Sequence, residues 1–402
     1  MQVSKPLLSI IIPTKNRQKY LLQCVEHVIQ RTSSKVEVVV QDNSDDDSLR
    51  QLLMSHKNAD KIKYNYVSKN LSFVENFSLG VELSDGKYLC MIGDDDGINP
   101  ELEKVVEWAD KNKIEAITPN IRVNYIWPDT GVPYYKTDNG NLMIIPFRNN
   151  VNFHNPKLEI EKLLYMGGQN YLKLKMAKVY HGVVTRAAMD RVKDITGVYF
   201  GGMSPDIYSS TALSLVVEQV LSIDYPLTIP GVCSNSGAGK SSTNRHHGKF
   251  SDSPFLSGHA NYSWSEKVPK FYSVETMWAD SFLAALKDMN RPDLIDKFNV
   301  EMISAYCLDK YPQFKDVVEC TLDKEGDADT TKLNSLSAYI KGPLNDMRSR
   351  ALNKMFYLFN RKVLLSNVSN IDAAYRCLDN YLTRKKYRVE TCLNSRILKG
   401  KE

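Results

Sequence analysis

Residues 88–108 read YLCMIGDDDGINPELEKVVEW, and three consecutive acids at 94–96 follow directly on an apolar run. Neighbouring carboxylates repel one another, so a chain that needed them only for solubility would spread them apart. The apolar run is typical of a buried strand, and Pro100 suits the first turn of a following helix. The sequence therefore predicts a strand whose carboxyl end carries a concentrated negative charge.

Length and composition are those of an ordinary globular protein. The 402 residues are 43% hydrophobic and 25% charged, enough for a large core and more than one structural unit. The apolar runs are too short for a transmembrane helix, and the opening MQVSKPLLSIIIPTKNR predicts a first strand rather than a signal peptide. Seven cysteines without a CxxC pair favour reduced thiols and hence a cytoplasmic protein.

The small net charge of +5 hides an asymmetry along the chain. Residues 341–402 contain 14 Lys and Arg against 5 Asp and Glu, so a basic tail follows a slightly acidic body. The tail contains no recognisable nucleic-acid-binding module, and we expect no nucleic-acid partner.

Part of this tail, 349–366, has the pattern of a basic amphipathic helix. Apolar residues fall on one face and basic residues on the other: Leu352, Met355, Phe356, Phe359 and Val363 against Arg350, Lys354 and Arg361. Such a helix can bind an anionic membrane surface, which would hold the protein at the inner face of the cell membrane. The alternatives are that it packs on the body of the chain or on a second subunit of a homo-oligomer.

The first 120 residues alternate strand-like and helix-like segments. Helical periodicity separates five strand-like runs, of which Pro13 ends the first: 7–12, 36–40, 62–67, 87–92 and 114–118. This alternation predicts an α/β fold, with a mostly parallel, Rossmann-like sheet covered by helices on both faces.

Ligands of open parallel sheets bind beyond the carboxyl ends of the strands. Three polar clusters fall at such ends, and we expect them to line one rim: 13–17 (PTKNR), 42–47 (DNSDDD) and 94–96 (DDD). Clustered carboxylates there suit Mg²⁺ or Mn²⁺, which prefer oxygen ligands and can bridge to phosphates. The alternative is an acidic turn that only caps the following helix.

Beyond residue 120 the pattern is less regular until a helix predicted over 203–221. Ser204 suits its N-cap, Pro205 suits its first position, and periodic apolar residues continue through Val220. Residues 233–263, rich in Ser, Gly, Asn and His, predict a long loop, and mainly helical segments follow.

In their order and spacing, these pieces resemble the nucleotide-sugar half of a family 2 glycosyltransferase with the GT-A fold. The resemblance covers residues 7 to about 102 and rests on SIIIPTKNR, VEVVVQDNSDDDS, NLSFVENFSLGVELSDGKYLCMIGDDD and NPELE. It implies a GT-A catalytic domain over 1–260, with a nucleotide-sugar half (1–120) and an acceptor half that includes a flexible loop (121–260). A helical, basic C-terminal region over 261–402 would follow.

The resemblance also implies where the donor and its metal bind. The nucleotide-sugar contacts it implies are Pro13, Thr14, Arg17, Asp42, Ser44, Asn70, Asn76, Asp94 and Asp95. The DxD-type motif implies Mn²⁺ or Mg²⁺ on Asp96 and Asp94, in a register ambiguous by one residue because all three positions are Asp. The chain departs from many members by carrying Glu75, rather than Arg, before Asn76.

An inverting transfer needs a general base for the acceptor hydroxyl. The family takes it from an acid at a helix start well after the metal motif, where GGMSPDIYSS supplies Asp206; Asp224 is the alternative. The helix dipole alone favours an acid in a first turn, so a purely structural role for Asp206 stays open.

Two further groups are expected near the reacting atoms. Arg245, His246 and His247 would neutralise the departing diphosphate, unless this loop is merely solvated. His181, in the sequence YHG, either touches the acceptor or packs in the core.

The sequence thus predicts a metal-dependent inverting glycosyltransferase that transfers a sugar from a nucleoside diphosphate, with UDP expected. The acceptor would be a hydroxyl of a glycan or lipid-linked glycan, as in surface polysaccharide synthesis. Two other classes stay open. A sugar nucleotidyltransferase would use the same sheet and metal, but PTKNR lacks its glycine-rich loop. A non-catalytic module would bind a cation or nucleotide without turnover.

Overall fold

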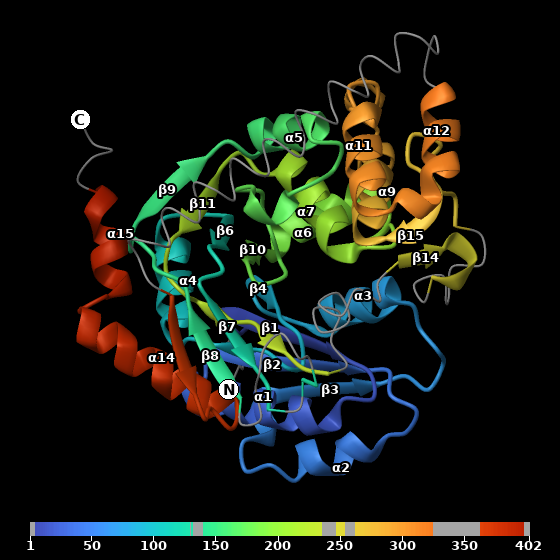
Figure 1. The fold of residues 1–402 in the computed structure, drawn as a ribbon. Helices are drawn as coiled ribbons and strands as arrows, with labels where there is room; N and C mark the ends of the chain where they lie inside the picture. Colours follow the sequence, from blue (N-terminus) through green and yellow to red (C-terminus); the bar gives the residue numbers. More distant parts are fainter. Residues whose placement is uncertain are drawn as a thin grey trace.

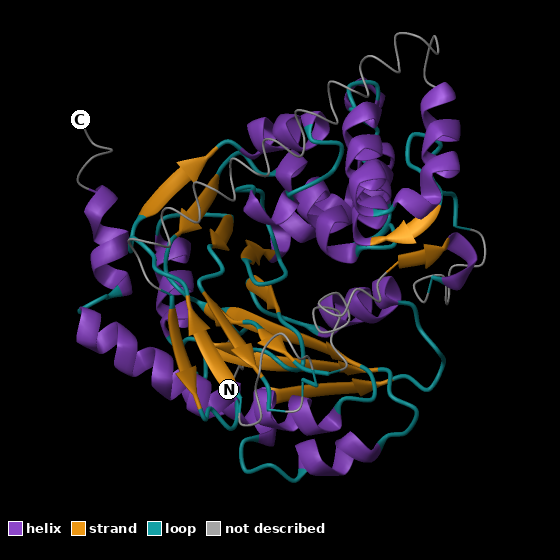
Figure 2. Ribbon diagram, in the orientation of Figure 1, coloured by secondary structure: helices purple, strands orange, loops and turns teal. Residues whose placement is uncertain are grey.

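A computed structural model of the chain describes residues 5–128, 130–131, 140–234, 247–253, 262–324 and 362–397. Figure 1 shows the fold, and Figure 2 separates its helices from its strands. The strands are β1 (Leu8–Thr14), β2 (Val36–Asp42), β3 (Ile62–Tyr66), β4 (Tyr88–Met91), β5 (Gly97–Ile98), β6 (Ala116–Pro119), β7 (Val123–Ile126), β8 (Asn141–Ile144), β9 (Val151–His154), β10 (Val183–Thr185), β11 (Val220–Ile223), β12 (Thr228–Ile229), β13 (Gly231–Val232), β14 (His247–Lys249), β15 (Phe271–Ser273) and β16 (Val363–Ser366).

The helices follow the expected alternation in the first half and dominate the second half. They are α1 (Gln18–Arg31), α2 (Ser48–Met54), α3 (Phe73–Leu83), α4 (Glu101–Lys111), α5 (Pro156–Tyr165), α6 (Arg186–Thr196), α7 (Pro205–Val216), α9 (Val274–Asp288), α10 (Pro292–Ile295), α11 (Val300–Lys310), α12 (Lys315–Asp323), α14 (Ile371–Lys385) and α15 (Val389–Ile397), with short 3-10 turns η1 (Ala59–Lys61), η3 (Tyr171–Lys173), η4 (Phe250–Asp252) and η6 (Pro312–Phe314). None of the helices that the structure describes combines the length and the apolar character that crossing a membrane requires.

The main sheet has the order β3-β2-β1-β4-β10-β6-β11-β9 and is mostly parallel, which confirms the predicted α/β class. Only β10 and β9 run antiparallel to their neighbours. The chain proceeds from β1 to β2 on one side and later returns to β4 on the other. The carboxyl ends of β1 and β4 are therefore a topological switch point, where ligands of such sheets bind. Smaller ladders, β13-β7-β8-β16, β12-β5 and β14-β15, complete the strands.

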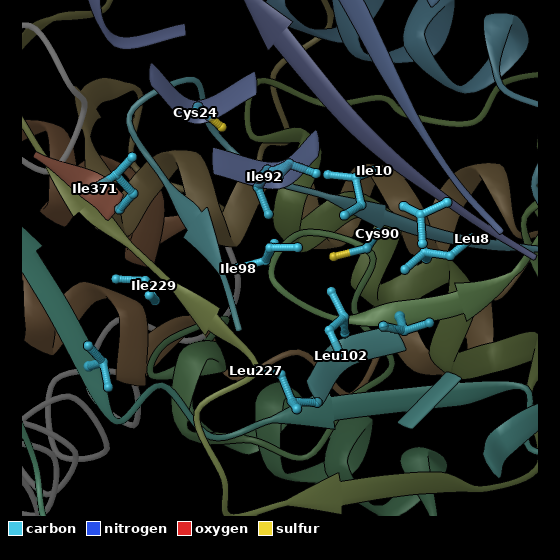
Figure 3. Close-up of a cluster of buried hydrophobic side chains, with 14 of the residues drawn as sticks. Leu8, Ile10, Cys24, Cys90, Ile92, Ile98, Leu102, Leu227, Ile229 and Ile371 are labelled. Atoms are coloured by element: carbon cyan, nitrogen blue, oxygen red, sulfur yellow. The ribbon is translucent and has the colours of Figure 1, made fainter. Parts of the chain in front are cut away.

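The central strands are buried on both faces. Every residue of β1, β2 and β4 is buried, which explains why these strands are mainly apolar. Figure 3 shows side chains of β1 and β4 packed with Leu102 of α4 in this core. Contrary to the prediction, Pro13 does not end the first strand, because β1 pairs with β2 through Thr14 and Asp42.

The C-terminal segment joins the N-terminal half. Ile371, at the start of α14, is buried in the same core as Ile98 (Figure 3), and α14 packs against α1. β16 pairs antiparallel with β8, so residues 363–366 are a strand and not the end of a helix over 349–366. Val363 and Leu365 are half-buried while Leu364 is exposed, the period-two pattern that sheet pairing imposes. Residues 349–361 lie outside the described residues.

A second apolar core lies among α5, α7, α9, α11 and α12, of which the last three stand together at the upper right of Figure 1. The helix predicted over 203–221 ends at Val216, and Val220 belongs to β11, because that segment pairs between β6 and β9. The domain boundary predicted at residue 260 falls in 254–261, outside the described residues, and stays a prediction.

Candidate functional site

Asp94, Asp95 and Asp96, here called the acidic triplet, are buried just beyond β4 at the switch point. Thr14 Oγ1 donates to Asp94 Oδ2 at 2.6 Å. Arg17 lies 2.9 Å from Asp94 Oδ1 and 2.9 Å from Asp95 Oδ1. Because β1 and β4 are parallel neighbours, the end of one strand delivers these partners to the acids at the end of the other.

Asp96 is held mainly by backbone groups. It accepts from Gly93 N at 2.5 Å and from Gly231 N at 2.6 Å, and His181 Nε2 lies 3.3 Å from its Oδ2. Only glycine permits the second approach, because a Cβ on Gly231 would stand 1.9 Å from the Asp95 carbonyl oxygen. Burial alone would raise the pKa of Asp96, but His181 and the two N–H groups lower it below its usual value.

The other two acids are incompletely neutralised. Burial raises the pKa of Asp94 to about 7 and that of Asp95 to about 6, although Arg17 opposes both shifts. One guanidinium is thus shared between two carboxylates. Asp95 Oδ2 is buried and has no hydrogen-bond partner among the described residues. Because a buried carboxylate oxygen without a partner costs free energy, this atom is suited to receive a ligand.

A divalent cation fits this arrangement in part. The described residues hold no group of three or more His, Cys, Asp or Glu placed to bind a metal. The oxygens of Asp94 and Asp96, the predicted ligands, already contact protein donors, whereas Asp95 Oδ2 is open. The excess of negative charge favours a cation, and Asp95 offers the oxygen that is ready to bind it. Ligation by Asp96 and Asp94 stays a prediction.

Asp42 and Ser44 lie at the neighbouring strand end, as predicted. Asp42 accepts from Ser44 N at 2.8 Å and from Tyr64 Oη at 2.8 Å. Ser44 Oγ in turn accepts from Asn16 N at 2.8 Å, which links the end of β2 to the loop after β1. Both residues therefore shape the rim, and their contact with a nucleotide stays a prediction.

The remaining predicted donor residues also reach this rim. Asn76 Nδ2 donates to the Thr14 carbonyl oxygen at 3.3 Å, and its Oδ1 is buried without a partner among the described residues. Lys15 Nζ donates to Asn70 Oδ1 and, at 3.2 Å, to Asn43 Oδ1. We did not single out Lys15 or Asn43 from the sequence, although both lie within the polar clusters at 13–17 and 42–47.

The departure at Glu75 has a local structural role. Its carboxylate accepts from Ser72 N at 2.8 Å and Ser72 Oγ at 2.9 Å, and the Ser72 hydroxyl accepts from Glu75 N at 3.2 Å. This is a capping box, which stabilises the start of α3.

Asp206 lies partly buried in the first turn of α7. Burial raises its pKa to about 6, and His181 lowers it. Tyr180 packs edge-on against His181, with 4.7 Å between ring centroids. Burial raises the pKa of Tyr180, and the triplet and Asp206 raise it further. Tyr180 and His181 thus lie within electrostatic reach of both the triplet and Asp206.

His181 belongs to the site more closely than its sequence context indicated. Its backbone φ of 55° is uncommon for a residue with a side chain, and its N–H donates to the Met91 carbonyl oxygen at 2.9 Å. Nδ1 lies 3.1 Å from Thr228 Oγ1, so the ring is fixed with Nε2 toward Asp96. No periodicity could have shown this contact, because β4 and the segment before β10 meet only through sheet pairing.

Asp224, the alternative base, is committed elsewhere. It accepts from Arg122 Nε at 2.6 Å, from Asn120 Nδ2 at 2.9 Å and from Arg148 N at 2.8 Å. Burial would raise its pKa, but these donors hold it below its usual value. Asp224 therefore serves as a structural ion-pair partner.

The predicted diphosphate loop is described only in part. His247 lies in β14, with its ring centroid 5.2 Å from that of Tyr311. Arg245 and His246 lie outside the described residues. A cavity of about 360 Å³ between α1, α2 and the start of α14 contains none of the predicted site residues. The candidate site is therefore defined by the polar groups at the switch point.

The chain is similar to known glycosyltransferases. A family model described as "Glycosyl transferase family 2" matches residues 9–171. Chondroitin synthase of Escherichia coli is 33% identical over 97 residues, 24% of this chain and 14% of that protein. The GalNAc(5)-diNAcBac-PP-undecaprenol beta-1,3-glucosyltransferase of Campylobacter jejuni is 31% identical over 94 residues, 23% of this chain and 30% of that protein.

The chain spans less than half the length of the curated relatives it matches. Among solved structures, S. aureus TarS 1-349 in complex with UDP-GlcNAc aligns over 85% of this chain and 92% of that chain, with 12% identity and a TM-score of 0.46. The family match begins in β1 and extends past the acidic triplet to η3, so it includes the ends of β1, β2 and β4. Residues 9–171 of the chain therefore match the family 2 glycosyltransferases.

Proposed function

We propose that the chain is an inverting glycosyltransferase that depends on Mn²⁺ or Mg²⁺ and uses a nucleoside diphosphate sugar, with UDP expected. The acceptor is a hydroxyl of a glycan or lipid-linked glycan. The proposal rests on one arrangement of buried groups. The acidic triplet has an open carboxylate oxygen on Asp95, and both the triplet and Asp206 lie within electrostatic reach of the rings of Tyr180 and His181. The polysaccharide and undecaprenol-linked substrates in the relatives' names support the acceptor class.

On the donor side, the described residues supply open oxygen atoms. Asp95 Oδ2 and Asn76 Oδ1 are buried acceptors without partners among the described residues, so they can bind a cation, a sugar hydroxyl or a base N–H. Arg17 fixes Asp94 and Asp95 in place. A divalent cation held by the triplet, with Asp95 as its most available ligand, would supply the positive charge that a departing diphosphate needs.

On the acceptor side, Asp206 is the general base. It takes the proton of the acceptor hydroxyl as that oxygen attacks the anomeric carbon. The bond from this carbon to the diphosphate oxygen breaks, and the nucleoside diphosphate leaves with the electron pair. The single displacement inverts the configuration. With a pKa of about 6, Asp206 is mostly ionised at neutral pH and remains basic enough to accept a proton.

A donor screen tests the proposed function without knowledge of the acceptor. The chain is incubated with a panel of nucleotide sugars and Mn²⁺, and release of nucleoside diphosphate is measured with and without EDTA. Release from a UDP-sugar that EDTA abolishes is expected. Undiminished release in EDTA would remove the metal from the proposal. Cation binding without release from any donor would favour a non-catalytic module.

Asp206→Asn tests the base. Transfer should fall by about 10²- to 10⁴-fold with the donor Kd unchanged, because the amide keeps the shape but cannot accept the proton. Wild-type kcat/KM should decline below a pH of about 6, since the base must be deprotonated. Asp316→Asn, which changes a first-turn acid of α12, is the matched control. Loss of donor binding in Asp206→Asn would instead make Asp206 a binding residue.

A further inference from the structure

The start of α7 lacks the side-chain cap that its sequence predicts. Ser204 occupies the N-cap position, but its hydroxyl makes no capping hydrogen bond among the described residues. The backbone just before the helix is instead held by the fully buried hydroxyl of Ser281, on α9. Its Oγ accepts from Met203 N at 3.0 Å and from Ser204 N at 2.8 Å. The backbone that leads into the helix carrying Asp206 is therefore fixed by a neighbouring helix.

The loop before α7, residues 202–204, packs closely against the Ser281 side chain. Gly202 has φ of +66°, and a Cβ there would stand 2.7 Å from Ser281 Cβ and 2.8 Å from its Oγ. No larger residue fits at position 202 without displacing either this loop or α9. The backbone of residues 202–204 thus approaches α9 as closely as its atoms allow.

A second contact fixes the same pair of helices. Tyr208 Oη, one turn into α7, donates to Asp288 Oδ2 at 2.6 Å. Ser281 and Asp288 are seven residues apart and lie on one face of α9. α9 therefore holds α7 on both sides of Asp206, which lies two residues after Ser204.

From this geometry we infer that Ser281 is a positioning residue for the transfer: it sets the place of Asp206 without touching the substrate. The inference rests on the proposed base role of Asp206. Without the hydroxyl, the N–H groups of Met203 and Ser204 lose their acceptor, and the backbone that leads into α7 must shift to satisfy them. A shift of about 1 Å at a catalytic group can lower a rate about 10²-fold.

The test is a double-mutant cycle between Ser281→Ala and Asp206→Asn. Turnover, donor Kd and melting temperature are measured for each variant. Ser281→Ala should lower kcat by about 10- to 100-fold and leave the donor Kd within about twofold. In the Asp206→Asn background it should change kcat by less than about twofold, because a base that is absent cannot be misplaced.

Ser304→Ala is the matched control. Ser304, on α11, is also a fully buried helical serine, and its Oγ has no hydrogen-bond partner among the described residues. Its replacement should leave kcat unchanged. Ser281→Cys, which fills the space with a weaker acceptor, should have an intermediate effect, and it carries the same cycle if Ser281→Ala does not fold.

The outcomes separate the inference from the proposed function. An unchanged kcat in Ser281→Ala, or an equal loss with and without the Asp206 carboxylate, overturns the positioning role alone. Full turnover of Asp206→Asn by itself overturns the proposed base, and the inference with it. A loss in Ser281→Ala that vanishes in the Asp206→Asn background supports both.

Discussion

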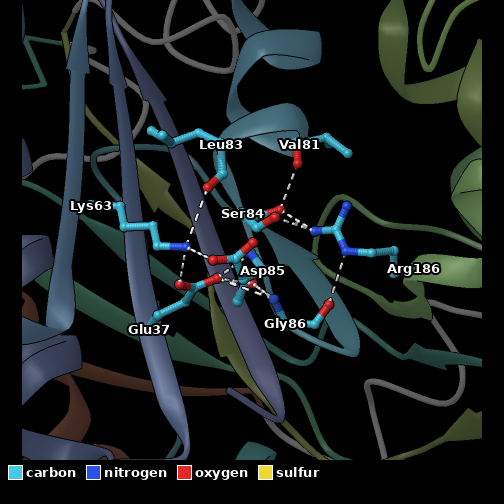
Figure 4. Close-up of polar contacts among 9 residues, drawn as sticks. Glu37, Lys63, Val81, Leu83, Ser84, Asp85, Gly86 and Arg186 are labelled. Atoms are coloured by element: carbon cyan, nitrogen blue, oxygen red, sulfur yellow. Dashed lines mark hydrogen bonds and ion pairs between the residues drawn. The ribbon is translucent and has the colours of Figure 1, made fainter. Parts of the chain in front are cut away.

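Buried acids lie at both ends of the central strands, and they differ in how completely their carboxylate oxygens are paired. At the amino end, Glu37 of β2 accepts from Ser9 Oγ and Asp85 N, each at 2.6 Å, from Gly86 N at 3.1 Å and from Lys63 Nζ at 2.9 Å (Figure 4). At the carboxyl end, Asp94 and Asp95 share one guanidinium, and Asp95 Oδ2 has no hydrogen-bond partner among the described residues. Both ends carry buried carboxylates, so the geometry of their partners makes the difference.

The amino end is a closed network. Lys63 also pairs with Asp85, and Arg186 donates to the Ser84 carbonyl oxygen at 2.7 Å and to that of Gly86 at 3.2 Å (Figure 4). These bonds fasten the turn between α3 and β4. A buried acid with all its acceptors filled stabilises a fold, whereas one with an open acceptor retains the capacity to bind a ligand. The open acceptor is therefore the physical reason to expect ligand binding at the carboxyl end of the strands.

The largest expected effect is that of Asp95→Asn. Turnover should fall about 10³-fold, because the open oxygen loses its charge while the amide oxygen can still face Arg17. Stability without added cation should not fall, since one of three crowded carboxylates is removed. Kinetics and thermal melting check both halves. A variant with normal turnover would show that the open oxygen is not functional.

Glu37→Ala should show the opposite behaviour. It removes the acceptor of three hydrogen bonds and a partner of Lys63, so the free energy of unfolding should fall by about 2–4 kcal/mol. Turnover of the folded protein should stay within about twofold. Denaturant unfolding and steady-state kinetics measure the two effects. Glu37→Gln keeps the accepting oxygen and should cost less than half as much; an equal loss would mean that the hydrogen bonds do not matter.

The smallest expected effect is the pH dependence of stabilisation by Mn²⁺, which should depend on the acidic triplet and not on Glu37. Because the folded protein raises the pKa of Asp94 and Asp95, it holds protons that the unfolded chain releases from about pH 4 upward. The contribution of these two acids to the free energy of unfolding therefore falls as pH rises toward about 7. A bound cation offsets this loss only where the acids are ionised. Mn²⁺ should raise the melting temperature by a few degrees more at pH 7.5 than at pH 5.5, in Glu37→Ala as in the wild type. Equal shifts at both pH values would place the cation elsewhere.

Much of the donor side was predictable because short, contiguous stretches of sequence encode it. The apolar runs of β1, β2 and β4 and the polar residues after each strand are contiguous in the sequence. Parallel pairing then brings such strand ends together. The C-terminal tail was less predictable, because the apolar spacing that fits a helix also contains the alternation of a strand, and pairing with β8 selected the strand for residues 363–366.

By itself, the sequence determined the α/β sheet, the rim that carries Thr14, Arg17 and the acidic triplet, and a helix start at Asp206. The tertiary structure alone decided which oxygens of the triplet are filled, and that His181 and Gly231 fill those of Asp96. It also decided that the Ser281 hydroxyl fixes the backbone before α7, where Ser204 makes no capping hydrogen bond among the described residues. The physical reason is that strand ends follow from short-range apolar patterns, whereas hydrogen-bond partners come from distant segments that meet only after the core has packed.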